Sequence, residues 1–144
     1  MRSFFLSSAI LLVLSSSLLA QSDQPKSPKM SAEAAIDGIQ VQVDYSAPSV
    51  KDRAIWDELV PYGKVWRTGA NEATTISLDK AIQINGQTLP AGKYALFTIP
   101  SEDSWVVIFN SESNQWGAYK YDSKKDVLKV EVPAQKSEFK SKCV

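Results

Sequence analysis

Histidine is absent from the 144 residues of this chain. Ser-His-Asp and Cys-His hydrolytic sites need an imidazole as base, and the His-Glu-x-x-His zinc site and the iron facial triad need it as a ligand. These enzyme classes are therefore excluded. Catalysis would have to depend on carboxylates, lysines, tyrosines or a bound cofactor, and the sequence indicates no catalytic constellation, no metal site and no cofactor.

The chain also has little cysteine and no formal net charge. Cys143 is the single cysteine, so no disulfide can form within the chain and packing must hold the fold. The 16 basic residues balance the 16 acidic ones, which argues against nucleic acid as a partner. Gly63 and Gly69 do not fall in a G-x-G-x-x-G or Walker pattern, so a glycine-rich phosphate loop is not predicted.

The first twenty residues have the pattern of a secretory signal. Arg2 precedes an apolar centre, and Ala20 supplies a small residue at the expected cut. The segment is too short and too rich in serine for a good membrane anchor. We therefore expect a signal peptide over residues 1–20, export to the periplasm or the exterior, and no stable membrane anchor after cleavage.

The rest of the chain reads as one domain. Residues 21–30, with Pro25 and Pro28, predict a disordered lead-in. A single domain is expected over residues 31–134, followed by a frayed or truncated end over 135–144. About two-thirds of the unfolded surface of a domain this size is buried on folding, so one core is feasible.

Short strands separated by turn residues dominate the pattern. Apolar and polar residues alternate with a period of two in several segments, and Asn85-Gly86 is a strong hairpin signal. Residues 93–99 lack a polar face, which is typical of a central strand covered on both sides. Strands are predicted over residues 39–45, 64–68, 74–78, 81–84, 87–89, 93–99, 105–109, 118–121 and 127–132.

The spacing of these strands predicts an all-β fold, an antiparallel β-sandwich of the jelly-roll or immunoglobulin-like type. One short helical turn is predicted within residues 49–59, because Val50, Ile55, Trp56 and Leu59 have helical spacing.

Residues 60–72 form the stretch where chemistry is most expected, because aromatic, cationic, amide and carboxylate side chains lie among glycines. Arg67 offers a planar fork for a carboxylate or phosphate. The alternative is that Arg67 pairs with Glu72 and only pins the loop. Trp116, in a polar loop, is expected to be exposed, whereas Trp105 is expected in the core. The candidate ligand-binding residues are Tyr62, Lys64, Trp66, Arg67, Asn71, Glu72 and Trp116.

Four motifs resemble an exported bacterial family filed as domain of unknown function 2911. They are Ala47-Pro48-Ser49-Val50-Lys51-Asp52-Arg53, Trp66-Arg67-Thr68-Gly69-Ala70-Asn71-Glu72, Leu89-Pro90-Ala91-Gly92-Lys93-Tyr94 and Asn114-Gln115-Trp116-Gly117. The resemblance implies a mainly β protein exported by Gram-negative bacteria, with no activity that can be assigned to a residue. Family members continue with further strands where this chain runs from Phe139 into Lys140-Ser141-Lys142-Cys143-Val144 and stops. This difference predicts either a truncated or frame-shifted chain or one that borrows strands from a partner.

The preferred functional hypothesis is a non-catalytic module that binds a small polar or glycan-like ligand, or a protein partner, at residues 62–72 with Trp116. One alternative is an assembly module that adds an exposed sheet edge to a neighbour. The other is an enzyme that uses Glu72 as base with support from Arg67 or Lys64, which requires Glu72 to be buried with a raised pKa.

Overall fold

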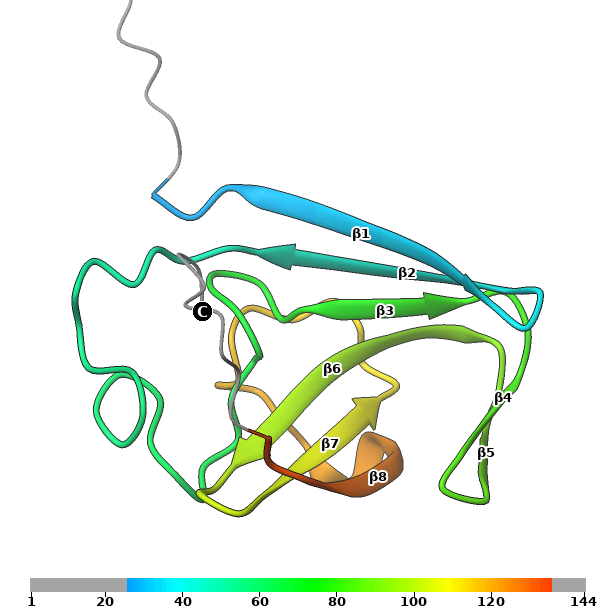
Figure 1. Cartoon of the computed structure of the whole chain (residues 1–144). Helices are drawn as coiled ribbons and strands as arrows, with labels where there is room; N and C mark the ends of the chain where they lie inside the picture. Colours follow the sequence, from blue (N-terminus) through cyan, green and yellow to red (C-terminus); the bar gives the residue numbers. More distant parts are fainter. Residues whose placement is uncertain (1–25, 136–144) are drawn as a thin grey trace, which may run out of the picture.

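The computed structural model describes residues 26–135. A six-stranded antiparallel sheet has the order β1-β2-β3-β6-β7-β8, and a separate hairpin pairs β4 with β5 (Figure 1). This confirms the predicted all-β, sandwich-like fold. The strands are β1 (Lys29–Ile36), β2 (Ile39–Ser46), β3 (Thr75–Leu78), β4 (Ile82–Ile84), β5 (Gln87–Leu89), β6 (Gly92–Pro100), β7 (Ser104–Asn110) and β8 (Asp126–Pro133).

The central strands β6 and β7 are covered on both faces, as the continuous apolar pattern predicted. Phe97 lies opposite Ile108, and both are fully buried on one face. Leu96, Phe109 and Leu128 pair across β6, β7 and β8 and point to the other face. The core therefore consists of two apolar clusters, one on each side of the sheet.

The hairpin of β4 and β5 covers one of these faces. Asn85 and Gly86 have φ values of 49° and 77°, the left-handed conformations that a tight two-residue hairpin needs. Leu89 at the end of β5 is fully buried and joins the cluster that contains Leu78 and Phe109. Such burial stabilises the fold by about 1.5–3 kcal/mol.

Irregular segments, instead of a complete second sheet, cover the other face. Ala118 and Tyr121 pack onto the cluster of Ala95, Phe97 and Ile108. The Tyr121 and Phe97 rings meet edge to face, with centroids 5.1 Å apart. The strand predicted over residues 118–121 is wrong, because this segment is a turn that delivers two apolar side chains to the core.

Residues 49–59 form a loop capped by an aromatic cluster, not the predicted helical turn. Lys51, Asp52 and Asp57 have positive φ values, which an α-helix cannot accommodate. Trp56 is stacked on Tyr62 and lies edge-on to Trp66 and Trp105, with centroid distances of 5.1–6.4 Å. Contacts between these rings, which stay partly exposed, replace helical packing. Within the described residues the one helix is the 3-10 turn η1 (Ser123–Lys125).

Two further segments differ from the predicted strands. The segment predicted as a strand over residues 64–68 is reduced to a single bridge between Trp66 and Thr98. Conversely, β1 was not predicted, because all eight of its residues are exposed and no buried face marks the strand. Its first residue, Lys29, lies within the segment expected to be a lead-in.

Several expectations fall outside residues 26–135. The signal peptide over residues 1–20 and most of the C-terminal segment 135–144 lie outside the described residues. Across the described part of the chain, no helix has the length and apolar character needed to cross a bilayer.

Candidate functional site

A tightly closed loop over residues 67–74 organises the candidate site. Thr68 and Asn71 have left-handed φ values of 57° and 58°, and the Thr74 hydroxyl donates to the Thr68 carbonyl at 2.8 Å. The Ala70 N–H donates to the Ser46 carbonyl at 3.0 Å, which ties the loop to the end of β2.

Gly69 is required for this contact. A Cβ atom there would lie 3.0 Å from the Thr74 hydroxyl oxygen and 3.1 Å from the Ser46 carbonyl oxygen. Both distances are shorter than an ordinary van der Waals contact between these atoms. The loop therefore approaches β2 only because the residue lacks a side chain. Ser46 lines one cavity of the protein and Gly69 lines another.

The same loop is joined to the segment that carries Trp116. Glu72 and Trp116 form an isolated antiparallel bridge, with the Ala73 N–H donating to the Gln115 carbonyl and the Gly117 N–H to the Asn71 carbonyl, both at 3.0 Å. Partners in such a bridge project to the same side, so the Trp116 indole stands beside the Glu72 carboxylate. The Trp116 side chain is 60% exposed, as predicted.

The larger cavity, which we call the polar groove, has a volume of about 430 Å³. It lies over β2, β3 and β6 and is bordered by Glu72 and by the loop that follows β7. Most of the residues that line it are charged, hydroxylated or amidic, and Met30 and Ala73 add apolar surface. The polar ones are Lys29, Ser31, Asp44, Tyr45, Ser46, Glu72, Thr75, Lys93, Ser113, Asn114 and Gln115.

Two ion pairs frame the polar groove. Lys29 Nζ lies 3.0 Å from Glu72 Oε1, and Lys93 Nζ lies 3.8 Å from Asp44 Oδ2. A backbone hydrogen bond and Lys29 hold the pKa of Glu72 below its ordinary value. The alternative in which Arg67 pairs with Glu72 is wrong, because the partner of Glu72 is Lys29.

Asp44 is held as an ionised acceptor in the groove. Its Oδ1 atom accepts hydrogen bonds from Gln42 Nε2 at 2.9 Å and Ser31 Oγ at 2.8 Å. These two bonds, with Lys93 as a smaller contribution, lower the pKa of Asp44. The groove thus presents fixed negative and positive groups side by side at neutral pH.

Gln115 is the one buried amide in the wall of the groove. It is 8% exposed, and its Nε2 donates to the Glu112 carbonyl at 2.6 Å. Its Oε1 atom is buried and has no hydrogen-bond partner among the described residues. An unmet buried acceptor costs about 1–3 kcal/mol, and a ligand that donates a hydrogen bond would recover that cost.

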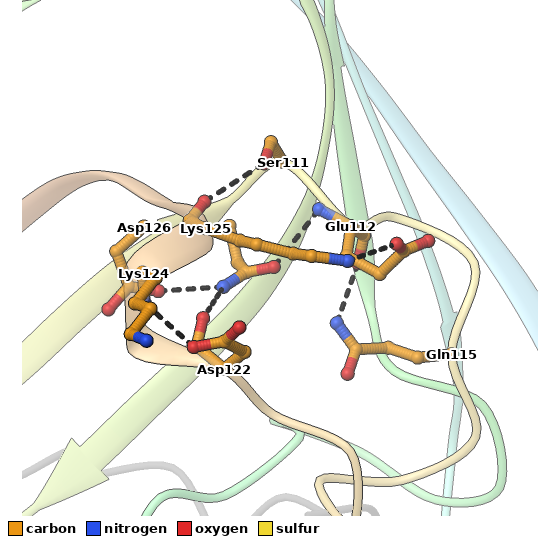
Figure 2. A network of polar contacts seen from close by, with 8 residues as sticks. Ser111, Glu112, Gln115, Asp122, Lys124, Lys125 and Asp126 are labelled. Carbon is orange, nitrogen blue, oxygen red and sulfur yellow. Dashed lines mark hydrogen bonds and ion pairs between the residues drawn. The ribbon is translucent and has the colours of Figure 1, made fainter.

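The loop that carries Gln115 and Trp116 rests on a polar network (Figure 2). Lys125 Nζ contacts Glu112 Oε2 at 2.8 Å, while the Gln115 amide donates to the backbone carbonyl of the same residue. Asn110, which is fully buried, donates through Nδ2 to Asp126 Oδ1 at 2.7 Å and to the Asp122 carbonyl at 3.0 Å. Neither Asn110 nor Gln115 was predicted as a site residue. Each has a signal in the sequence: Asn110 directly ends an apolar strand, and Gln115 directly precedes a tryptophan that is expected to be exposed.

The structure separates the residues predicted as one site. Glu72 lies in the polar groove and Trp116 lies beside it, whereas Trp66 and Arg67 line the other cavity. Tyr62 belongs to the aromatic cluster. Lys64 is exposed and lines neither cavity. Asn71 contributes its backbone carbonyl, which accepts a hydrogen bond from the Gly117 N–H.

The condition set for the enzyme alternative is not met. The Glu72 side chain is 45% exposed, and its pKa is lowered, not raised. A carboxylate in this state is a weak proton acceptor at neutral pH. Residues 26–135 also hold no group of three His, Cys, Asp or Glu side chains suited to a metal ion.

Comparison with known proteins gives one result. The profile of a family described as protein of unknown function (DUF2911) matches residues 27–142, which is most of the chain. The chain belongs to this family. The DUF2911 match spans every strand of the sheet and all residues that line the two cavities except Lys26, which confirms the resemblance carried by the sequence motifs. Neither a curated protein nor a solved structure matches the chain.

Proposed function

We propose that this DUF2911 protein binds a small polar ligand of the glycan class in the polar groove, without catalysing a reaction on it. The observation that carries the proposal is the buried Gln115 Oε1 atom, which lacks a partner in the wall of a groove lined by charged and hydroxylated groups. Native proteins rarely leave a buried acceptor unpaired, so a hydrogen-bond donor from a ligand is the natural complement.

The groove offers the mixture of groups that sugars use. Sugar hydroxyls both donate and accept, so they can pair with the Asp44 and Glu72 carboxylates and with the Lys29 and Lys93 ammonium groups. The exposed Trp116 ring beside Glu72 supplies a flat apolar face of the kind that packs against a sugar ring. A volume of about 430 Å³ lies within the usual range for small-molecule sites.

The proposed location is the periplasm or the exterior of the cell, where envelope glycans are available. The sequence of residues 1–20 supports this part of the proposal, because it has the charge, apolar centre and small final residue of a secretory signal.

Calorimetry and tryptophan fluorescence against a panel of neutral and charged saccharides test the proposal. We expect saturable binding that Trp116→Ala weakens, while Tyr119→Ala binds normally. Tyr119 is a matched control because it is an aromatic residue that is 86% exposed but, unlike Trp116, has no bridge to Glu72 of the groove. The proposal fails if no saccharide binds the wild-type protein, or if the two variants behave alike.

A second candidate function, assembly through β1, is favoured by one observation. All eight residues of β1 are exposed, and β2 is its one partner in the described sheet. Open strand edges accept further strands. Concentration-dependent dimers on a sizing column, abolished by Ala34→Lys in β1, would support assembly, whereas a monomer at every concentration would contradict it.

A further inference from the structure

The second cavity is a concentration of positive charge, and we call it the basic pocket. It has a volume of about 310 Å³, and Gly69 is among the residues that line it. Its lining includes the cations Lys26, Lys51, Arg53 and Arg67, with Trp66 beside them, and contains no aspartate or glutamate. Like charges gathered in this way repel one another unless an anion lies between them.

None of these four cations has an ion pair among the described residues. The carboxylates of the ion pairs seen there are bound to other lysines, namely Lys29, Lys93, Lys125 and Lys129. No carboxylate among residues 26–135 therefore pairs with the cations of the basic pocket, although carboxylates elsewhere on the surface are paired.

Arg53 is held in place by the backbone. Its Nε donates to the Val50 carbonyl at 3.0 Å, and its Nη2 donates to the Ser49 carbonyl at 2.6 Å. Two consecutive residues just before it, Lys51 and Asp52, have left-handed φ values of 49° and 54°. Strained backbone of this kind often marks a functional position. The result is a guanidinium fixed before a ligand arrives, with its remaining nitrogen available.

Arg67 has an unmet donor. Its side chain is partly buried, and the Nε–H group is sealed from solvent without a hydrogen-bond acceptor in the described part of the chain. A buried charged donor without an acceptor is costly. Arg67 and Arg53 both line the basic pocket, so an oxygen-rich anion there would supply hydrogen-bond acceptors to both side chains.

We infer that the basic pocket binds a phosphate or sulfate group, either as a free ion or as part of a larger molecule. Arginine forks match the oxygen geometry of these groups, and a doubly charged anion balances several cations better than a single carboxylate does. This inference is independent of the saccharide proposal, since the two cavities share no lining residue.

Calorimetry with the whole protein tests this inference. The ligands are inorganic phosphate, sulfate and glycerol 3-phosphate, and the controls are acetate and glycerol. We expect the three oxyanions to bind and to raise the melting temperature. Arg67→Gln should weaken phosphate binding by about tenfold or more, because charge-assisted hydrogen bonds are lost. Tighter binding of glycerol 3-phosphate than of phosphate would identify a carried group as the source, and equal binding a free ion.

Lys64→Gln is the matched control, because it removes one nearby charge that does not line the basic pocket. Its affinity for phosphate should be within about twofold of that of wild type, because salt screens an exposed charge that lies outside the pocket. If Arg67→Gln does not fold, Arg67→Lys and Arg53→Gln replace it, and each should weaken binding. Absence of binding by all three oxyanions, or equal effects of the Arg67 and Lys64 variants, would overturn the inference.

Discussion

Glu72 and Trp116 are partners in an isolated antiparallel bridge, and this single backbone contact joins the two loops that border the polar groove. The exposed indole consequently stands beside a carboxylate that Lys29 holds at 3.0 Å. Neither residue belongs to a regular strand, so the bridge depends on the hydrogen bonds from Ala73 and Gly117. One border of the groove is thus set by a contact between loops, while strands form its floor.

Gly69→Ala should destabilise the protein and disturb both cavities. The added Cβ would press on the Thr74 hydroxyl and on the Ser46 carbonyl, and overpacking of this kind costs about 1–3 kcal/mol. Urea unfolding measures the loss. Gly63→Ala is the control: it has nothing within 4 Å of its Cβ but a φ of +69°, so it should lose stability through backbone strain while keeping ligand affinity. Unchanged stability of Gly69→Ala would contradict the close contact.

Asn110→Ala should lower the free energy of unfolding by about 2–3 kcal/mol, because buried hydrogen-bonding groups lose their partners. Asn110 Oδ1 accepts from the Glu112 N–H, and Nδ2 donates to Asp126 and to the Asp122 carbonyl. Chemical denaturation is the measurement. Asn114→Ala, at an exposed position, should stay within about 0.5 kcal/mol of wild type, and similar losses for the two variants would refute the role given to Asn110.

Low pH should reduce the free energy of unfolding, in part because Asp44 becomes protonated. Its folded pKa lies below the ordinary value of 3.8, so its contribution to stability is present above pH 3.8 and is lost as the pH falls through the folded pKa. Unfolding free energies measured across the acid range should therefore depend less on pH in Asp44→Asn than in wild type. An NMR titration that places the pKa of Asp44 at or above 3.8 would speak against this.

Leu89→Ala should cost about 2–5 kcal/mol, because a fully buried leucine is replaced and a cavity remains. Leu89 anchors the β4–β5 hairpin to the cluster around Leu78 and Phe109. Thermal and urea unfolding measure the effect. Val127→Ala, at an exposed apolar position of β8, should change stability far less. Equal effects would mean that the hairpin contributes little to the core.

The strands with a distinct local pattern were predicted correctly. Residues 39–45 alternate, residues 93–99 are continuously apolar, and Asn85-Gly86 specifies a turn. These correspond to β2, β6 and the β4–β5 hairpin. Each signal depends on neighbours along the chain, so it can be recognised without knowledge of the fold. By contrast, β1 has no buried face and residues 118–121 bury side chains without a strand, so the local pattern misleads there.

The sequence by itself determined the fold class, the family and the stretch in which functional side chains are concentrated, because hydrophobic period, turn residues and motifs are properties of adjacent residues. Only the tertiary structure decided that Glu72 pairs with Lys29, that Arg67 joins Arg53 in a different cavity, and that Gln115 keeps an unpaired oxygen. Those relationships link residues far apart in the chain. They are set by left-handed loop residues and by the close approach of Gly69 to β2, for which the linear pattern carries no signal.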